Sequence, residues 1–400
     1  MGETLKGQDI VVISQQSWDT DLGSNCKDLA FELSKYNRVL YVNSPVDRIS
    51  LIRRRLNPSL DRRLTIVGSR GNNLFKIKRG LWNLHPSCIV ESINWIDNPK
   101  VFNFFNKRNN SKFSDSIKDA LNTLGFKNFL LLNDSEIFKA FYLVEYLKPR
   151  LSIYYSRDNM LAVTYWKKHG SRLEPELIKK SDLCFTNSEY LAHYCRNYNA
   201  DTFNVGQGFR IEDFIASPKE RPSALQPIER KIIGYVGALN GSRLDIDIIS
   251  KIALSFPEIY VVLIGPQDEI FKTCKLHYYS NIIFLGQKDV REVASYINAF
   301  DVCINPQLVN ELTIGNYPRK IDEYLSLGKP VVATKTMTME VFKEVVYLAE
   351  HPDDFVAGIR EALLNTDFIT RQQRINIALS HSWENSVLQM TKQIKQKLNH

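Results

Sequence analysis

The stretch from 317 to 334, YPRKIDEYLSLGKPVVAT, holds the charged residues that most clearly suggest chemistry. Arg319 and Lys320 follow Pro318 at the start of a short predicted helix, and Glu323 lies one turn further on. Cations at a helix N-terminus oppose the helix dipole, so a bound anion would offset that cost. Such a phosphate clamp, with a carboxylate one turn deeper, could hold a nucleoside diphosphate and its ribose hydroxyls. The alternative is an ion pair between Arg319 and Glu323, worth roughly 0.2–0.5 kcal/mol.

A group of glycines suggests a second contact with an anion. Gly234, Gly237 and Gly241 follow one another across the end of a predicted strand at 231–237. Their spacing differs from the G-x-G-x-x-G of dinucleotide-binding folds. Gly237 could form only a tight turn, or it could let a phosphate approach the backbone at a helix start. Arg243 could contact the same anion or be an ordinary surface residue.

Strands that alternate with helices must position these residues. In the second half, strands are predicted at 231–237, 259–265, 281–286, 301–306, 330–334 and 345–349, with helices at 245–256, 266–277, 289–300 and 353–364. In the first half, strands are predicted at 9–14, 38–43, 128–133, 151–155 and 182–187, with helices at 24–36, 113–124, 135–147 and 189–198. This alternation predicts an α/β fold with parallel sheets, whose ligands bind beyond the carboxyl ends of the strands.

The composition is that of a globular chain of two domains. The 400 residues are 44% hydrophobic and 24% charged, and their apolar runs are shorter than a membrane span. The beginning of the chain does not resemble a signal peptide. Six scattered cysteines without a C-x-x-C pair favour reduced thiols in a cytosolic protein over disulfides or a zinc site.

The positive charge is concentrated in the first half. Residues 1–215 hold 31 Lys and Arg against 23 Asp and Glu, whereas the remainder is balanced at 21 against 21. Residues 48–79 hold ten basic residues and one acidic residue, with apolar residues between them. This segment could be a solvated surface, or it could bind an anionic membrane. The candidate membrane residues are Arg53, Arg54, Arg55, Arg62 and Arg63. Nucleic acid is not predicted, because no nucleic-acid motif accompanies the segment.

Several of these segments together carry a family resemblance. The succession Gly234–Leu239, LIGP (263–266), NIIFLGQKD (281–289), DVCINP (301–306) and PRKIDEYLSLGKPVVAT is similar to the nucleotide-sugar domain of GT-B glycosyltransferases. It most resembles the large, mostly retaining family 4, or "glycosyl transferases group 1", and within it bacterial enzymes of cell-surface polysaccharide synthesis such as the teichuronic acid type. NVGQGFRIEDF (204–214) and the tail around Trp383 extend the likeness to most of the chain, although it is weak over 45–125.

The resemblance implies the GT-B architecture. Two Rossmann-like domains would face each other across a cleft, and a C-terminal helix would cross back to the first domain. The implied boundaries are 1–214 for an acceptor-binding domain, 215–229 for a linker, 230–366 for a nucleotide-sugar domain and 367–400 for the crossover helix.

The resemblance also implies roles for residues of the second half. Glu323 would bind the ribose, Arg243 and Lys320 would neutralise the diphosphate as catalytic cations, Gly237 would border it, and the backbone near Lys288 would contact the base. Pro266, Gly315 and Arg319 complete the implied donor site. No metal or other cofactor is then required, because protein cations stabilise the leaving group.

The chain departs from the family pattern at two positions. Gly315 stands where the family has the first glutamate of its Glu-x7-Glu pair. Glu311 could take its place, or backbone amides could hold the donor sugar. Gln207 stands where the family has an asparagine.

Acceptor residues are expected in the first half. Asp19 or Asp21 could orient or deprotonate an acceptor hydroxyl, and Arg157 with Asp158 is another candidate. Gly23 and Ser24 could line the acceptor side, and His85, in the same cleft, could contact the donor sugar. Each of these could equally serve as a helix cap, a surface residue or a structural residue.

The expected function is a glycosyltransferase that transfers a sugar from a nucleoside diphosphate, UDP or GDP, to a glycan or polyprenyl-linked acceptor. It would be retaining, metal-independent, cytoplasmic and docked at the inner face of the cell membrane. The alternatives are a non-catalytic subunit that binds a nucleotide sugar, supported by the missing glutamate, and a nucleotide-sugar epimerase of the same fold.

Overall fold

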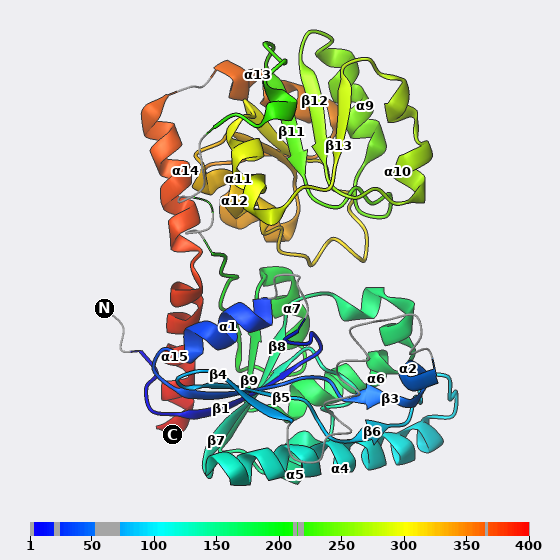
Figure 1. Cartoon of the computed structure of the whole chain (residues 1–400), viewed down its shortest axis with the longest axis vertical. Helices are drawn as coiled ribbons and strands as arrows, with labels where there is room; N and C mark the ends of the chain where they lie inside the picture. The colour runs from blue at the N-terminus through cyan, green and yellow to red at the C-terminus, as the bar shows by residue number, and fades with distance from the viewer. Residues whose placement is uncertain are drawn as a thin grey trace. The chain divides into compact units, whose positions relative to one another are not determined.

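The chain divides into two compact units in a computed structural model. Unit 1 comprises Met1–Gly206 and Trp383–His400, and unit 2 comprises Gln207–Ser382 (Figure 1). The structure describes residues 4–19, 25–52, 73–210, 214, 220–364 and 367–399. Within these ranges, no helix is both long enough and apolar enough to span a bilayer. All six cysteines are free thiols.

Unit 1 is built on an eight-stranded sheet in the order β10-β9-β8-β7-β1-β2-β5-β4. Its strands are β1 (Asp9–Ser14), β2 (Arg38–Val42), β4 (Leu74–Lys78), β5 (Leu81–Leu84), β7 (Phe129–Asp134), β8 (Leu151–Ser156), β9 (Leu183–Thr186) and β10 (Thr202–Asn204). All neighbours pair in parallel except β4 and β5, which are antiparallel. A second, two-stranded parallel sheet consists of β3 (Val46–Asp47), which comes after β2 in the chain, and β6 (Ile89–Val90), which comes after β5.

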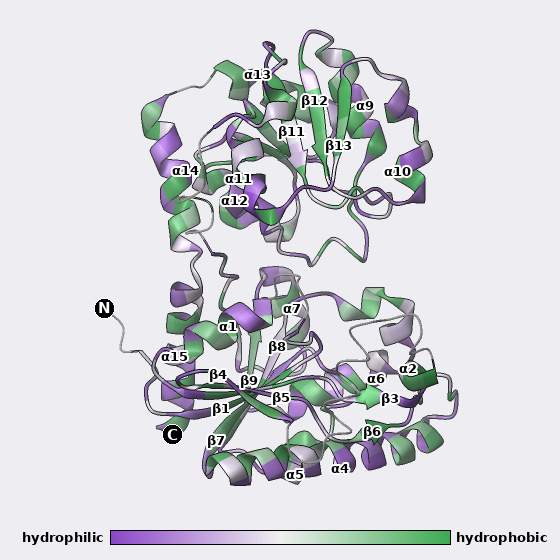
Figure 2. Ribbon diagram, viewed as in Figure 1, coloured by the Kyte–Doolittle hydropathy of each residue, from purple (hydrophilic) through white to green (hydrophobic). Residues whose placement is uncertain are grey.

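Helices cover both faces of this sheet. On one face, α1 (Asn25–Leu33) and α15 (Trp383–Leu398) pack against the strands in one hydrophobic core. On the other face, α4 (Pro99–Leu124) and α5 (Leu143–Leu147) pack against the strands in a second core. The remaining helices of unit 1 are α2 (Arg48–Ile52), η2 (Met160–Ala162), α6 (Thr164–Lys180) and α7 (Glu189–Arg196). The two colours mixed along α4 in Figure 2 show its amphipathic character.

The end of the chain returns to unit 1, as predicted. The segment forms two helices, α14 (Phe368–Ser380) in unit 2 and α15 in unit 1. Trp383, Val387, Met390 and Ile394 of α15 recur at helical spacing and are all buried in the core that contains α1. This buried face explains why the helix belongs to the first unit, because helices in proteins are stabilised mainly by packing of an apolar face.

The predicted helix at 135–147 is wrong over most of its length. Only Leu143–Leu147 is α-helical. The Asn133 side chain accepts a hydrogen bond from the Glu136 amide, and Glu136 Oε1 accepts from the amides of Phe138 and Lys139. These side chains occupy backbone donors that a helix would need, so turns form instead.

The predicted helix at 113–124 is only the second half of a helix that begins at Pro99. Asn98 caps it by accepting from the amides of Lys100 and Val101. Its first half contains buried asparagines that the hydrophobic pattern did not reveal. The Asn109 side chain bonds to the backbone of Glu91, and the Asn110 side chain bonds to the backbone of Phe138. These contacts exist only in the folded chain.

Unit 2 contains a six-stranded, entirely parallel sheet in the order β13-β12-β11-β14-β15-β16. Its strands are β11 (Ile232–Val236), β12 (Tyr260–Ile264), β13 (Ile282–Gly286), β14 (Val302–Asn305), β15 (Val331–Thr334) and β16 (Tyr347–Ala349). The core on one face includes α9 (Ile246–Ser255) and α13 (Pro352–Leu364), and that on the other includes α11 (Val290–Asn298) and α12 (Lys320–Ser326). Short helices complete the unit: η3 (Ser223–Leu225), α10 (Glu269–Thr273), η4 (Lys275–Tyr278) and η5 (Met337–Phe342).

One carboxyl group in the core of unit 1 makes stability depend on pH. Glu174 of α6 is 3% exposed and accepts hydrogen bonds from the hydroxyls of Tyr154, at 2.7 Å, and Tyr194, at 3.4 Å. Burial raises the pKa of Glu174 to about 7, although the two tyrosines act to lower it. The folded protein therefore holds a proton here that the unfolded chain releases near pH 4.5.

We expect Glu174→Gln to remove a pH-dependent loss of stability. Between the unfolded and folded pKa values the folded state binds more protons, so wild-type stability falls as pH rises through this window. The change amounts to about 3 kcal/mol, because one pKa unit corresponds to about 1.4 kcal/mol. Urea unfolding from pH 4.5 to 8.5 should show a flatter profile for this variant than for the wild type. Glu176→Gln, on an exposed position of the same helix, is the control. Equal profiles for both variants would contradict the assignment.

Candidate nucleotide-binding site

Two glycine turns meet at the carboxyl edge of the unit 2 sheet. Gly237 follows β11 with φ 147°, and Gly265 follows β12 with φ 148°. The Gly237 amide donates to Ile264 O at 2.8 Å, and the Leu239 amide donates to Pro266 O at 2.8 Å. A Cβ on Gly265 would lie 2.0 Å from Gly237 O, so only glycine allows these two backbones to pack this closely.

Lys320 lies over the first of these turns. A Cβ built on Gly237 would lie 2.8 Å from Lys320 Nζ. The ammonium group donates to the Tyr235 hydroxyl at 2.5 Å and lies 4.2 Å from the centre of that ring. The fold thus brings a half-buried cation from α12 to the glycine turn of β11, two features that the sequence analysis singled out separately.

Tyr324 fastens α12 to the same strand. Its hydroxyl accepts a hydrogen bond from the Val236 amide at 2.9 Å, and its ring is fully buried. Val236 directly precedes Gly237, so this bond sets the distance between the helix and the turn. Tyr235 and Tyr324 were not predicted as site residues, because aromatic residues within an apolar pattern usually indicate the hydrophobic core.

Glu323 forms the ion pair that was the alternative interpretation of this stretch. Arg319 Nε lies 3.2 Å from Glu323 Oε1, and the side chains are 41% and 15% exposed. An exposed pair of this kind contributes little to stability. One oxygen of Glu323 engages Arg319, and a carboxylate has further acceptor capacity. The pair is therefore compatible with a ligand that bonds to Glu323.

The loop that carries Arg243 is held firmly by its backbone. The Arg243 amide donates to Asn240 O at 3.0 Å, and its carbonyl accepts from the Leu308 amide at 2.8 Å. The Asn310 side chain also donates to Ser242 O at 2.9 Å. The Arg243 side chain is exposed and makes no ion pair with any residue in the described ranges. A cation on a fixed loop is thus available at the same edge of the sheet.

A buried polar cluster behind α12 was missed by the sequence analysis. Asp322 is 0% exposed, and its two oxygens lie 2.7 Å from His381 Nδ1 and 2.7 Å from the Tyr317 hydroxyl. Burial raises the pKa of Asp322, although His381 and Tyr317 act to lower it. The His381 carbonyl accepts from the Phe209 amide at 3.2 Å. The cluster therefore ties α12 to both segments at which the chain passes between the units.

Other predicted donor residues lie on loops at the same edge. Lys288 follows β13, is half-buried and lies 5.6 Å from the centre of the Tyr296 ring. Pro266 is exposed. Its carbonyl accepts a hydrogen bond from the Leu239 amide, which connects the loops after β11 and β12. Gly315 is buried and Glu311 is exposed, both in the loop between β14 and α12. The contacts of these residues with a ligand stay predictions.

The predicted acceptor residues of unit 1 differ in their surroundings. Arg157 is buried and paired with Asp134, with Nη2 2.7 Å from Oδ2. Burial alone would lower the pKa of Arg157, but the carboxylate of Asp134 outweighs it and raises that pKa. Asp158 beside it is exposed, and Asp19 is half-buried in the loop after β1. His85 is 6% exposed, with Nε2 3.0 Å from Asn83 Nδ2.

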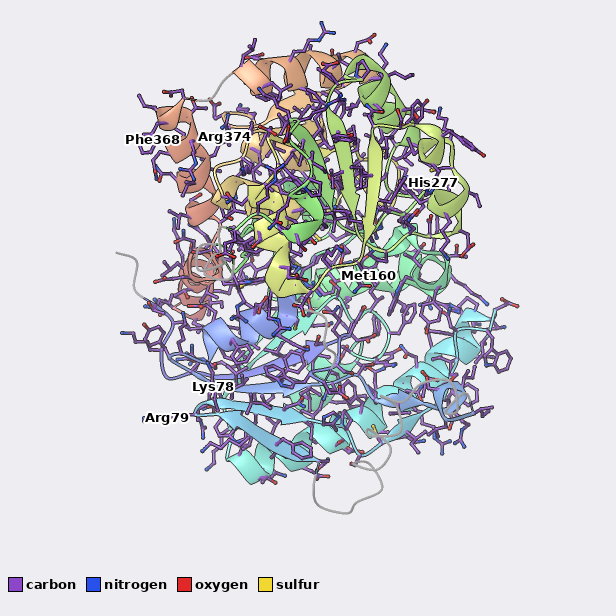
Figure 3. The ribbon with its side chains drawn as sticks, turned by 45° about the horizontal axis from the view of Figure 1, so that its top comes forward. Lys78, Arg79, Met160, His277, Phe368 and Arg374 are labelled. Carbon is purple, nitrogen blue, oxygen red and sulfur yellow. The ribbon has the colours of Figure 1, made fainter. Side chains whose placement is uncertain are left out.

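Several predicted residues fall outside the described ranges. These are Asp21, Gly23 and Ser24 of the acceptor set and Arg53, Arg54, Arg55, Arg62 and Arg63 of the membrane set. Elsewhere in the basic segment, Lys78 and Arg79 stand at the β4–β5 hairpin of unit 1 (Figure 3). Lys78 Nζ lies 4.9 Å from the centre of the Phe31 ring, and Arg79 is exposed.

Comparison with known sequences finds a family match within the second unit. Residues 230–365 match the family described as Glycosyl transferases group 1. The chain is also 30% identical over 242 residues to a Bacillus subtilis (strain 168) protein, TuaH, named as a glycosyltransferase of teichuronic acid biosynthesis. That alignment covers 57% of this chain and 60% of the relative.

Comparison with solved structures identifies the fold of the whole chain. Sucrose-phosphate synthase from Thermosynechococcus elongatus superposes with a TM-score of 0.66 at 15% identity, covering 97% of this chain and 98% of that one. Alr3699/HepE of Anabaena, in complex with UDP and glucose, gives 0.61 at 15% identity and covers 98% and 99%. Trehalose 6-phosphate synthase from Burkholderia multivorans gives 0.68 at 9% identity, covering 98% and 97%. The shared fold is GT-B, with two Rossmann-like domains.

Substitution of the edge glycines should destabilise the protein in a fixed order. Gly265→Ala should cost most, more than about 3 kcal/mol, because the new Cβ meets backbone that cannot move aside. Gly237→Ala should cost less, since the Lys320 side chain it meets is flexible. Gly286→Ala, with φ 65° and open space around it, should cost only about 1 kcal/mol of backbone strain. Thermal unfolding midpoints measure the order, and equal midpoints for Gly265→Ala and Gly286→Ala would contradict the close packing.

Proposed function

We propose that the protein is a glycosyltransferase, because residues 230–365 match the family described as Glycosyl transferases group 1 and the chain has the GT-B fold. It transfers a sugar from a nucleoside diphosphate to a saccharide or lipid-linked acceptor in cell-surface polysaccharide synthesis. The observation that carries the proposal is the position of Lys320 Nζ over the Gly237 turn. UDP is the favoured nucleotide, because the Anabaena neighbour was solved with UDP and glucose.

The cations act on the leaving group. In the transfer, the bond from the anomeric carbon to the diphosphate oxygen breaks, and a bond from that carbon to the acceptor oxygen forms. The acceptor proton passes to the departing diphosphate, which is the base in a retaining reaction. Negative charge grows on the diphosphate as it leaves, so Lys320 and Arg243 stabilise the transition state more than the bound donor. We propose that these cations make a metal ion unnecessary.

Glu323 provides the ribose contact. It lies one helical turn beyond Lys320, its side chain is 15% exposed, and it retains acceptor capacity beside Arg319. A carboxylate that accepts from both ribose hydroxyls would place the diphosphate toward the start of α12. The donor sugar then lies near the loop between β14 and α12, where Gly315 stands at the position that the family resemblance assigns to a glutamate.

Removal of the Lys320 charge should slow transfer strongly. We expect Lys320→Ala to lower kcat/KM for the UDP-sugar by about 10²–10³-fold, the usual effect of losing one preorganised charge donor. The matched control is Lys251→Ala, which removes an exposed lysine of α9 that pairs with Asp353 of α13 at 2.8 Å. Thermal shift with UDP reports binding separately from turnover. Full activity of Lys320→Ala would refute the assignment.

The same assay separates the two interpretations of Glu323. Arg319→Gln removes the ion pair and keeps the carboxylate, whereas Glu323→Gln removes the carboxylate charge as well. If Glu323 binds ribose, only Glu323→Gln should raise KM, by about 10- to 100-fold. Equal effects would show that the ion pair alone matters. Isomerisation of the donor sugar without acceptor would instead support an epimerase.

We also propose that unit 1 docks on an anionic membrane from the cytoplasmic side. Ile49 and Ile52 of α2 are 40% and 80% exposed, and this helix leads into the arginine-rich segment. Exposed apolar residues beside a cluster of cations are the combination that favours a lipid surface.

Liposome flotation tests this docking. Replacing Arg53, Arg54 and Arg55 by Ser should lower binding to vesicles with anionic lipid by about 10²-fold, since each basic residue contributes about 1 kcal/mol near such a surface. Binding to vesicles of neutral lipid should not change. Unaltered flotation of the triple variant with anionic vesicles would exclude this segment as the membrane contact.

A further inference from the structure

A cavity of about 1110 Å³ lies in unit 1 and is lined by residues of that unit. Its walls come from segments that follow the carboxyl ends of β2, β5, β7 and β8. Ligands of parallel α/β sheets bind at this edge. The volume lies slightly above the range of ligand pockets, which is roughly 300–1,000 Å³, and exceeds what one monosaccharide needs.

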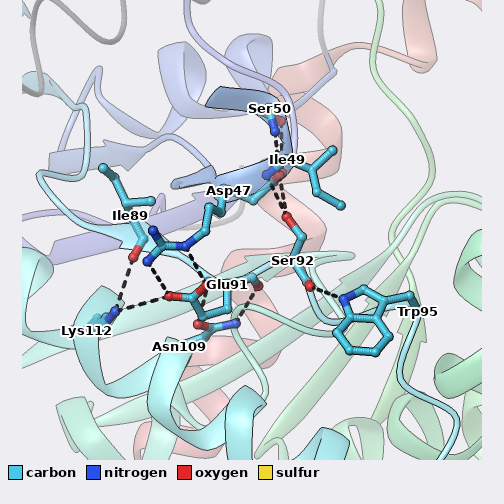
Figure 4. Close-up of polar contacts among 10 residues, drawn as sticks. Asp47, Ile49, Ser50, Ile89, Glu91, Ser92, Trp95, Asn109 and Lys112 are labelled. Carbon is cyan, nitrogen blue, oxygen red and sulfur yellow. Dashed lines mark hydrogen bonds and ion pairs between the residues drawn. The ribbon is translucent and has the colours of Figure 1, made fainter. Parts of the chain in front are cut away.

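Two aromatic residues line the cavity with side chains that are not buried, and one of these side chains is held by a hydrogen bond. Trp95 is 72% exposed, and its indole nitrogen donates to Ser92 O at 2.8 Å (Figure 4). Tyr165 is 53% exposed, and its carbonyl accepts from Asn94 Nδ2 at 3.0 Å. An exposed tryptophan that the protein fixes in place offers a flat apolar face, and such a face suits the C–H surface of a sugar ring.

The carboxylates of the cavity are already engaged by neighbouring donors of the protein. Asp47 accepts from the Ser50 amide, the Ser50 hydroxyl and the Ser92 hydroxyl at 2.8–3.0 Å. Burial alone would raise the pKa of Asp47, but these bonds and Lys139 lower it, so it stays ionised. Glu91 forms two 2.7 Å bonds with Arg48 (Figure 4). These acids are therefore poor partners for ligand hydroxyls.

The donors of the cavity have capacity to spare. Lys139 Nζ donates to Ser44 Oγ at 2.8 Å and Pro45 O at 3.2 Å, and Lys168 Nζ contacts Asp97 and Trp95 O. An ammonium group has three donors, so each lysine keeps one for a ligand. Asn106 is 1% exposed, and its Nδ2 has no hydrogen-bond partner among the described residues. A buried amide donor left unpaired is destabilising, and a ligand acceptor would remove that cost.

We propose that this cavity binds a saccharide that carries an oxyanion, a carboxylate or a phosphate. The sugar ring stacks on Trp95, and the oxyanion accepts from Lys139 and Lys168. Given the proposed glycosyltransferase function, this saccharide is the growing end of the acceptor. The oxyanion can belong to a uronic acid within a glycan or to the phosphate of a lipid-linked sugar, and the two sources present the same chemistry to the cavity.

Saturation-transfer difference NMR on the full chain tests the site with three probes: glucuronic acid, glucose 1-phosphate and glucose. Excess UDP is present throughout, so that the unit 2 site is filled and its own binding is recorded separately. We expect one or both anionic probes to bind at least fivefold more tightly than glucose. Preference for glucuronic acid indicates a uronate in the glycan, and preference for glucose 1-phosphate indicates a lipid-linked phosphate.

Two variants and a control assign the binding to this cavity. Trp95→Ala should weaken the anionic probe at least fivefold, and Lys168→Gln should remove the preference over glucose. Tyr36→Ala, an aromatic residue of unit 1 that is 53% exposed, should change neither. Binding that survives Trp95→Ala, or the absence of signal with all three probes, would overturn the proposal. In both cases the NMR signal of bound UDP still reports on the unit 2 site, so the proposed function is tested separately from this cavity.

Discussion

The close packing of the Gly237 and Gly265 turns is the constraint on which the unit 2 site depends. With no side chain on either residue, the loops after β11 and β12 share backbone hydrogen bonds and approach within contact distance. Because Gly237 has no side chain, Lys320 Nζ can lie directly over it. Tyr324 fixes the helix that carries the lysine, because its hydroxyl accepts a hydrogen bond from the Val236 amide. A charge held by rigid partners loses little freedom when an anion binds, which makes it an effective stabiliser of a developing charge.

The two units use the same edge of a parallel sheet for different chemistry. In unit 2, the loops at this edge present cations and backbone close to a glycine turn, a combination suited to phosphate. In unit 1, the segments after the strands present fixed aromatic faces and spare amide and ammonium donors around a cavity. The first arrangement suits a nucleotide and the second suits a saccharide, so each substrate of the proposed transfer has a site of matching chemistry within one unit.

Buried polar clusters connect the site to the rest of its unit. Asp322, on the same helix as Lys320 and Glu323, contacts His381 and Tyr317, and the His381 carbonyl accepts from the Phe209 amide. Removing one partner from such a cluster leaves a buried polar group without a hydrogen bond, which lowers the stability of the fold. The cluster therefore favours this one arrangement of α12. The start of α12 is thereby linked, through its buried face, to the segments where the chain leaves and re-enters unit 2.

The sequence by itself determined the alternation of strands and helices in unit 2, the parallel sheet, the GT-B resemblance, and the choice of Lys320, Glu323 and Gly237 as candidate site residues. These features follow from local periodicity, from glycine and proline positions, and from charges close together in the chain. Tertiary structure alone decided what the asparagines of α4 bond to, why 135–147 is mostly not helical, and that Tyr235, Tyr324 and His381 surround α12. It also decided that Trp95 and Lys168 share a cavity. Such contacts join residues far apart in the sequence, and a side chain's partner in them depends on packing that no local pattern encodes.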